Sequence, residues 1–100
     1  MKIDIQFVNI DTSESLKTYT TEKLNKLNEK HGMLIHADVF FKKENDPKRH
    51  GKICEIELSL SGPRVFASTN EKNYEVAVKH VINDLDRQLK KRKSVLKPYL

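Results

Sequence analysis

The chain has 100 residues, of which 37% are hydrophobic and 33% charged, and this suits one domain with one modest core. No stretch approaches the roughly 18 uninterrupted apolar residues of a membrane span, and Asp4 stands where a signal peptide would need its apolar centre. Cys54 has no second cysteine to pair with, and its place in an alternating apolar run predicts a small buried side chain in a reducing compartment. We therefore expect a single cytoplasmic domain over residues 1–100.

The net charge of +5 is unevenly distributed along the chain. Residues 71–100 hold eight Lys and Arg against four Asp and Glu, whereas residues 1–70 hold eleven against ten. Residues 87–100 contain six basic residues and no acidic one. Such a block favours a polyanionic partner, which includes nucleic acid, an acidic protein and an anionic membrane. Charge alone leaves an ordinary solvated helix face as an equal alternative.

The N-terminal part of the chain predicts a strand followed by a helix. Residues 1–8 alternate between apolar and polar side chains, which is typical of a half-buried strand. A helix is expected over residues 12–30, capped by Asp11 or Thr12, and Asp11 has the spacing of a capping box to Glu14. The inward stripe of this helix is predicted to be Leu16, Thr20, Leu24, Leu27 and His31, with Tyr19 at the margin.

Three further strands are expected in the middle of the chain. Residues 37–42 alternate, and residues 45–51 form a polar turn. The cleanest alternation runs over residues 54–61, with one face in the core and one in water. Residues 61–64 then predict a hairpin turn into a strand over residues 65–69.

A long helix is predicted over residues 71–97. This helix is expected to end there because Pro98 disfavours helical backbone at the residue before it. Gly32 is the corresponding stop of the first helix. The apolar stripe of the long helix comprises Val78, Val81, Ile82, Leu85, Leu89 and Leu96. The element order is β-α-β-β-β-α, with the first two strands parallel and the next two connections hairpins. We expect an α+β fold in which both helices pack on the one apolar face of a four-stranded sheet.

The solvent-facing side of the last helix is the strongest functional signal. On a helical wheel one flank and the back are basic over about seven turns, with Asp84 and Asp86 at the borders. The first helix has a row of lysines at i, i+3 and i+7 that merges with this surface if the helices pack side by side. The predicted RNA-binding set from these rows is Lys23, Lys26, Lys30, Lys79, Arg87, Lys90, Lys91 and Lys97, and the family resemblance described below adds Lys93.

Phosphate contacts are favoured over base recognition at this surface. The chain has no Trp, and Phe40 and Phe66 on the other face of the sheet make only a weak stacking platform. We therefore expect structured RNA to be recognised by shape and phosphate geometry.

Catalytic and metal-binding patterns are not found. The four histidines are scattered without a grouped ligand spacing, so we expect no metal and no cofactor. The serines lack a nucleophile motif, and Glu55 with Glu57 on one strand face is better explained as a solvated sheet surface than as an active-site pair. We predict that the chain is not an enzyme.

The sequence resembles the ribosome hibernation-promoting factor family, also called ribosome-associated inhibitor A or sigma-54 modulation protein. The similarity covers nearly the whole chain, and in the first half it includes a short strand, a Thr-capped helix and Lys23 with Lys26. In the second half it rests on Ala67-Ser68, Asn73-Tyr74, Ala77-Val78, Val81-Ile82-Asn83 and the run from Leu85 to Lys91.

The resemblance implies a fold like that of double-stranded-RNA-binding domains and a place in the mRNA and tRNA channel of the small ribosomal subunit. Its members inhibit translation in starvation or stationary phase and contact 16S-type rRNA. The family's basic positions fall on Lys23, Lys26, Arg87, Lys90 and Lys91, and less specifically on the lysines that follow them. The chain looks like a short form that is monomeric off the ribosome, without the C-terminal domain of long members.

Two departures from the family pattern affect the start and the middle of the last helix. The family's helix-start Tyr aligns with Glu75, and Tyr74 lies one position earlier, where we expect a packing adjustment. Lys90 stands where Asn is frequent and adds a charge. A general double-stranded-RNA-binding module and a module that binds an acidic protein, such as a sigma factor, remain alternatives.

Overall fold

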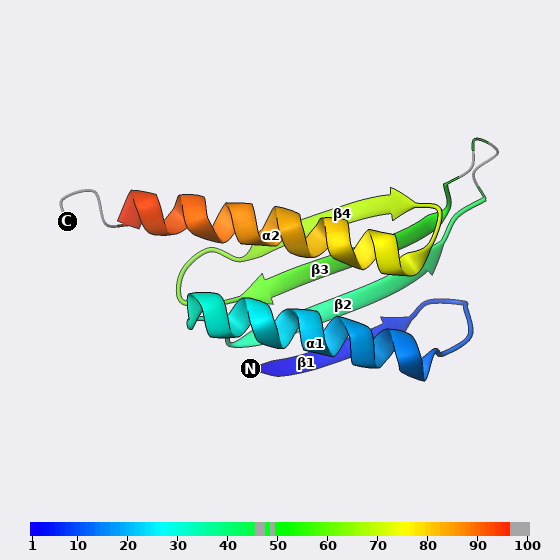
Figure 1. Ribbon diagram of the computed structural model, residues 1–100, viewed down its shortest axis with the longest axis horizontal. Helices are drawn as coiled ribbons and strands as arrows, with labels where there is room; N and C mark the ends of the chain where they lie inside the picture. Colours follow the sequence, from blue (N-terminus) through cyan, green and yellow to red (C-terminus); the bar gives the residue numbers. More distant parts are fainter. Residues whose placement is uncertain (46–47, 49, 97–100) are drawn as a thin grey trace.

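The computed structural model describes residues 1–45, 48 and 50–96, without the side chains of residues 93–96. Its elements follow the predicted order (Figure 1): β1 (Lys2–Phe7), α1 (Glu14–His31), β2 (His36–Lys43), β3 (Lys52–Ser59), β4 (Val65–Glu71) and α2 (Tyr74–Leu96). Neither helix combines the length and apolar character needed to cross a membrane, within the described residues.

The four strands form one sheet in the order β1-β2-β3-β4. β1 and β2 are parallel and are connected through α1, whereas β2 with β3 and β3 with β4 are antiparallel. Both helices lie side by side on one face of this sheet and run in the same direction (Figure 1). The predicted α+β fold is therefore confirmed, including the parallel first pair and the common helical face.

The core lies between the sheet and the two helices. Alternate side chains of β2 and β3 are fully buried, and they meet the apolar stripes of α1 and α2. All five residues of the predicted α1 stripe are buried. On α2, Val78, Val81, Leu85 and Leu89 are buried, and Ile82 is half-buried at the margin. Cys54 is fully buried, and burial raises the pKa of its thiol to about 12, as expected of a packing residue.

The start of α1 differs from the prediction. The N-cap is Ser13, whose Oγ accepts a hydrogen bond from the Leu16 N–H at 3.2 Å, so the predicted caps Asp11 and Thr12 are wrong. Asn9 has a left-handed backbone with φ 57°, and this turn delays the helix. At the other end Gly32 adopts φ 68° and stops the helix as predicted.

α2 begins at Tyr74, three residues after the predicted start, because Glu71 belongs to β4 and pairs with Lys52 of β3. The Asn73 side chain accepts a hydrogen bond from the Val76 N–H at 2.8 Å and caps the helix. The Tyr74 hydroxyl donates to the Lys42 carbonyl at 2.8 Å, and its ring meets Phe41 edge-on with centroids 5.5 Å apart. Tyr74 thus packs against Phe41 of the core at the start of α2, and the predicted helix end at Lys97 lies outside the described residues.

Candidate nucleic-acid interface

The lysine row of α1 lies directly beside α2. A groove of about 220 Å³ runs between the helices and is lined from α1 by Lys23, Lys26, Leu27 and Lys30, and from α2 by Ile82, Asn83 and Asp86. The lysines meet α2 here because the α1 stripe and the α2 stripe both face the core, which turns the flank of each helix toward the other. Lys30 of α1 and Lys90 of α2 both reach the Asp86 carboxylate, so the two basic rows meet at this flank. We call this feature the interhelical groove.

Asp86 is the ionic centre of the interhelical groove. Its Oδ2 lies 3.1 Å from the Lys30 ammonium and 3.3 Å from the Lys90 ammonium. Its Oδ1 lies 2.8 Å from Nε2 of His31, which must donate because an ionised carboxylate only accepts. The carboxylate thus has three donors, of which Lys30 and His31 join α1 to α2.

The electrostatics of this cluster follow from its geometry. The pKa of Asp86 is lowered to about 2, first by the hydrogen bond from His31 and then by those from Lys30 and Lys90, while partial burial acts in the opposite direction. The pKa of Lys30 is raised, chiefly by its hydrogen bond to Asp86. The sequence placed Asp86 only at the border of the basic arc. The i,i+4 spacing to Lys90 was visible in the sequence, but Lys30 and His31 lie more than fifty residues away and meet Asp86 only after folding.

The remaining predicted residues of α2 divide between its groove flank and its back. Arg87 and Lys91 are exposed and lie opposite the buried Leu89 stripe, where they face solvent. The Arg87 side chain is 74% exposed and only 3.7 Å from the Asp84 carboxylate, which is a loose i,i+3 pair. Lys79 is exposed on the groove flank, nearer the start of the helix.

The structure describes the three remaining predicted residues, Lys93, Lys97 and Lys23, to different extents. Lys93 belongs to α2 by its backbone, and Lys97 lies outside the described residues. Lys23 is half-buried, with its ammonium 5.3 Å from the centroid of the Tyr19 ring.

Arg92 belongs to the basic block of the sequence but has a structural role. Its guanidinium donates to the carbonyls of Ser61 and Pro63 in the turn between β3 and β4, the first at 2.7 Å. Gln88 makes a parallel contact, with its amide donating to the Phe66 carbonyl at 2.9 Å. The planar fork of Arg suits two carbonyls at once. One of the six charges in the block is therefore directed toward the sheet and away from the basic surface.

The open face of the sheet carries acidic side chains beside basic partners. Glu55 pairs with Lys42 at 2.9 Å, and Glu57 pairs with Arg64 at 2.6 Å. Phe66 is 53% exposed on this face, and Phe40 is half-buried. Each ring has a glutamate as its cross-strand partner, Glu55 for Phe40 and Glu57 for Phe66, so this face suits a polyanion less well than the helical face.

The open face also brings together a histidine and two aspartates that are far apart in sequence. Asp4 and Asp38 are partners in the parallel register of β1 and β2, and Nε2 of His36 lies 3.1 and 3.0 Å from their carboxylates. Sequence spacing missed this group because parallel pairing, not a local motif, assembles it. The ligand atoms lie within 4.8 Å of one another, as in a metal site, but the imidazole already bridges both carboxylates.

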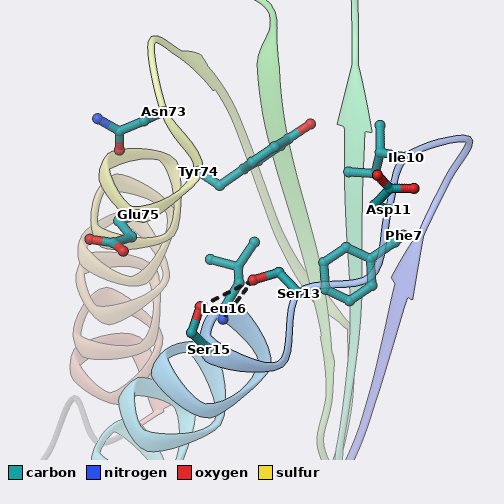
Figure 2. A pocket seen from close by; sticks show the side chains of 9 residues that line it. All are labelled: Phe7, Ile10, Asp11, Ser13, Ser15, Leu16, Asn73, Tyr74 and Glu75. Carbon is teal, nitrogen blue, oxygen red and sulfur yellow. Dashed lines mark hydrogen bonds between the residues drawn. The ribbon is translucent and has the colours of Figure 1, made fainter.

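A larger pocket of about 460 Å³ lies where α1 and α2 begin (Figure 2). Phe7, Ile10, Leu16 and Tyr74 form its apolar lining, and Asp11 and Glu75 add two carboxylates. Both helix N-termini at this pocket are already capped by side chains of the chain, Ser13 and Asn73. The pocket is therefore a poor anion site despite the two helix starts, and the interhelical groove is the better candidate for phosphate.

Comparison with known proteins agrees with this fold. Residues 3–97 match the family described as "Sigma 54 modulation protein / S30EA ribosomal protein". The chain belongs to this family.

Among its relatives, the ribosome hibernation promoting factor of Pseudomonas putida is 28% identical over 93 residues, which are 93% of this chain and 87% of that protein. A ribosomal subunit interface protein from Coxiella burnetii has a similar structure, with a TM-score of 0.83, 22% identity, and coverage of 94% of this chain and 99% of that one. The N-terminal domain of Protein Y from Thermus thermophilus superposes with a TM-score of 0.75 at 20% identity, over 91% of this chain and 98% of that one. These two structures share the β-α-β-β-β-α fold.

Proposed function

We propose that the protein is a ribosome hibernation factor that binds the small ribosomal subunit in the mRNA and tRNA channel. By occupying this channel it inhibits translation during starvation or stationary phase, and it acts in the cytoplasm without catalysis. Family membership, and the similarity to the ribosome hibernation promoting factor of Pseudomonas putida, support the ribosome as partner. The observation that carries the proposal is the interhelical groove, where three lysines of α1 line one surface and Lys90 of α2 joins Lys30 at Asp86.

The binding surface proposed on these grounds has two parts. Lys23, Lys26, Lys30 and Lys90 lie at the interhelical groove, and Arg87 and Lys91 lie on the exposed back of α2. Both parts face away from the sheet, so one approach of a folded RNA reaches them together. Lys79, Lys93 and Lys97 extend the surface along α2 by their position in sequence. Each phosphate neutralised releases counterions, which gives the interaction a steep dependence on salt.

Co-sedimentation with purified small subunits tests this proposal, together with inhibition of translation in a cell extract. The variant Arg87→Glu with Lys91→Glu should lose both activities, with affinity reduced by roughly 100-fold or more, because two cations become anions on the phosphate-facing surface. Both side chains are exposed, so thermal unfolding should be almost unchanged.

The matched control is Lys2→Glu with Lys43→Glu, which changes net charge by the same amount at exposed positions on strands. This control should retain binding within about threefold at 0.15 M salt. Wild-type binding by the helix variant, or an equal loss in both variants, would show that the basic helical surface is not the site.

The two alternative functions predict different partners in the same assay. A general double-stranded-RNA-binding module would bind a free RNA duplex as tightly as it binds small subunits. A module for an acidic protein would retain its partner after nuclease treatment of a lysate. We expect neither result, because the proposed binding surface extends across two helices and requires a folded rRNA with phosphates presented to both.

A further inference from the structure

The Asp86 carboxylate occupies the position in the interhelical groove that is best suited to another anion. Its Oδ2 collects the Lys30 and Lys90 ammonium groups, one from each helix. Lys23 and Lys26 line the same groove, and the Asn83 side chain adds a polar group. An oxygen held by two ammonium groups at 3.1 and 3.3 Å is the arrangement that a phosphate oxygen would require.

We infer that Asp86 competes with an RNA phosphate for Lys30 and Lys90: in the free protein both ammonium groups bind its carboxylate, and in the bound protein they turn to the phosphate while the carboxylate remains beside it. This inference rests on the proposed function for the identity of its RNA partner. It adds that the groove contains a built-in competitor, which opposes RNA binding while it stabilises the fold.

The two sides of the Asp86 carboxylate differ in how firmly they are held. Oδ1 is bound by His31, whose side chain is only 2% exposed and cannot follow a movement toward solvent. Oδ2 is bound by the Lys30 and Lys90 side chains, which are 51% and 58% exposed and can reorient on their flexible stems. When phosphate enters, the lysines turn to it, but the carboxylate stays in the groove and repels it.

Removal of this single charge should therefore act in opposite directions on stability and on binding. Asp86→Asn keeps the side-chain size and an oxygen that accepts from His31, but it eliminates the repulsion and frees both lysines. A unit charge about 5 Å from a phosphate corresponds to roughly a 5- to 15-fold gain in affinity for RNA at about 0.15 M salt, and the gain shrinks as more salt is added. The same variant should unfold at a lower temperature, because three donors lose an ionised acceptor.

Glu75→Gln is the matched control. It removes the same charge from the same helix, at an exposed position eleven residues earlier. Eleven residues of α-helix span about 16 Å, which exceeds the screening length of about 8 Å at physiological salt. The control should therefore leave affinity within about twofold of the wild-type value.

Two probes separate the inference from the proposed function. On immobilised heparin, a polyanion that is independent of the ribosome, Asp86→Asn should elute at higher salt than Glu75→Gln. With purified small subunits, the same order of affinity is expected. If the wild-type chain does not bind small subunits but the heparin order holds, the inference stands and the proposed function fails. If Asp86→Asn and Glu75→Gln behave alike on heparin, the inference is wrong.

A measurement on the wild-type chain keeps the test independent of how well the variant folds. The 13C chemical shift of the Asp86 carboxyl carbon should change when a heparin oligosaccharide is added, since Oδ2 loses its ammonium partners. The Asp38 carboxyl carbon, whose partner His36 is 3.0 Å away on the open face of the sheet, serves as the internal reference. An Asp86 signal that does not move beyond the Asp38 signal at saturation contradicts the exchange of anions.

Discussion

The helical face and the open sheet face are both rich in charge, but they distribute it differently. On the sheet, charges of opposite sign are placed side by side, as in the Glu55–Lys42 and Glu57–Arg64 pairs. In the interhelical groove one carboxylate, Asp86, is shared by Lys30 and Lys90, while Lys26 lines the same groove. This difference indicates that a polyanion-binding surface is distinguished by its ratio of lysines to acidic side chains, and not by its number of lysines.

Among single substitutions, the largest expected effect compares one charge reversal on each face. Lys26→Glu places an acid in the interhelical groove and should weaken binding to small subunits by roughly 30-fold at 0.1 M salt, because attraction becomes repulsion. Arg64→Glu makes the same change of charge at the sheet and should alter binding less than about twofold. Filter binding of labelled small subunits measures both. Equal losses would remove the distinction between the two faces.

The next effect concerns acid stability at Asp86. Folding lowers the pKa of this carboxyl from 3.8 to about 2, so its contribution to stability is present above about pH 4 and is lost as the pH falls toward 2. The contribution is about 2 kcal/mol at neutral pH. Urea unfolding should show Asp86→Asn less stable than wild type by about this amount at pH 7, with the difference closing below pH 3. A difference that does not change with pH would contradict the ionic role.

A smaller effect separates two neighbouring cations of α2. Arg92→Gln should reduce the free energy of unfolding by about 1 kcal/mol, because the Ser61 and Pro63 carbonyls lose their donor, and should change small-subunit affinity less than threefold. Lys91→Gln should have the reverse pattern, with unchanged stability and about fivefold weaker binding. Thermal unfolding and co-sedimentation of both variants measure this. Matching profiles would mean that Arg92 and Lys91 are not functionally distinct.

The smallest expected effect lies on the open sheet face. Phe66→Ser removes its most exposed aromatic ring and should leave binding to small subunits within about twofold. Stability should change by no more than about 0.5 kcal/mol, since the ring is not part of the core. A loss of affinity above fivefold by filter binding would indicate that bases stack on the sheet and that phosphate contacts are only part of recognition.

The fold was largely predictable because its periodic signals are strong and local. The alternation through Cys54 and the helical stripe through Leu85 and Leu89 placed the core and the common face of the helices. The residues at which the helices and strands begin and end were harder to predict. The left-handed turn at Asn9 moved the α1 cap to Ser13, and cross-strand pairing extended β4 at the expense of α2. Such shifts depend on tertiary pairing, which overrides local preference.

The candidate site was only half predictable, for a physical reason. A helical wheel gives the face of each lysine on its own helix, but not which acids a neighbouring helix brings to it. It therefore missed the shared role of Asp86 with Lys30 and His31. It also counted Arg92 with the basic block, although the hairpin turn takes its guanidinium. Both differences arise between elements that are distant in sequence.

The salt dependence of binding to purified small subunits is the most direct test of whether the protein binds RNA through phosphate contacts of its two helices. With about six phosphate contacts, the logarithm of the association constant should fall against the logarithm of the salt concentration with a slope of about −4 to −5. Removal of two contacts in Arg87→Gln with Lys91→Gln should make the slope shallower by about 1.5. A slope near zero, or one that this double variant leaves unchanged, would contradict binding through the phosphate-facing helices.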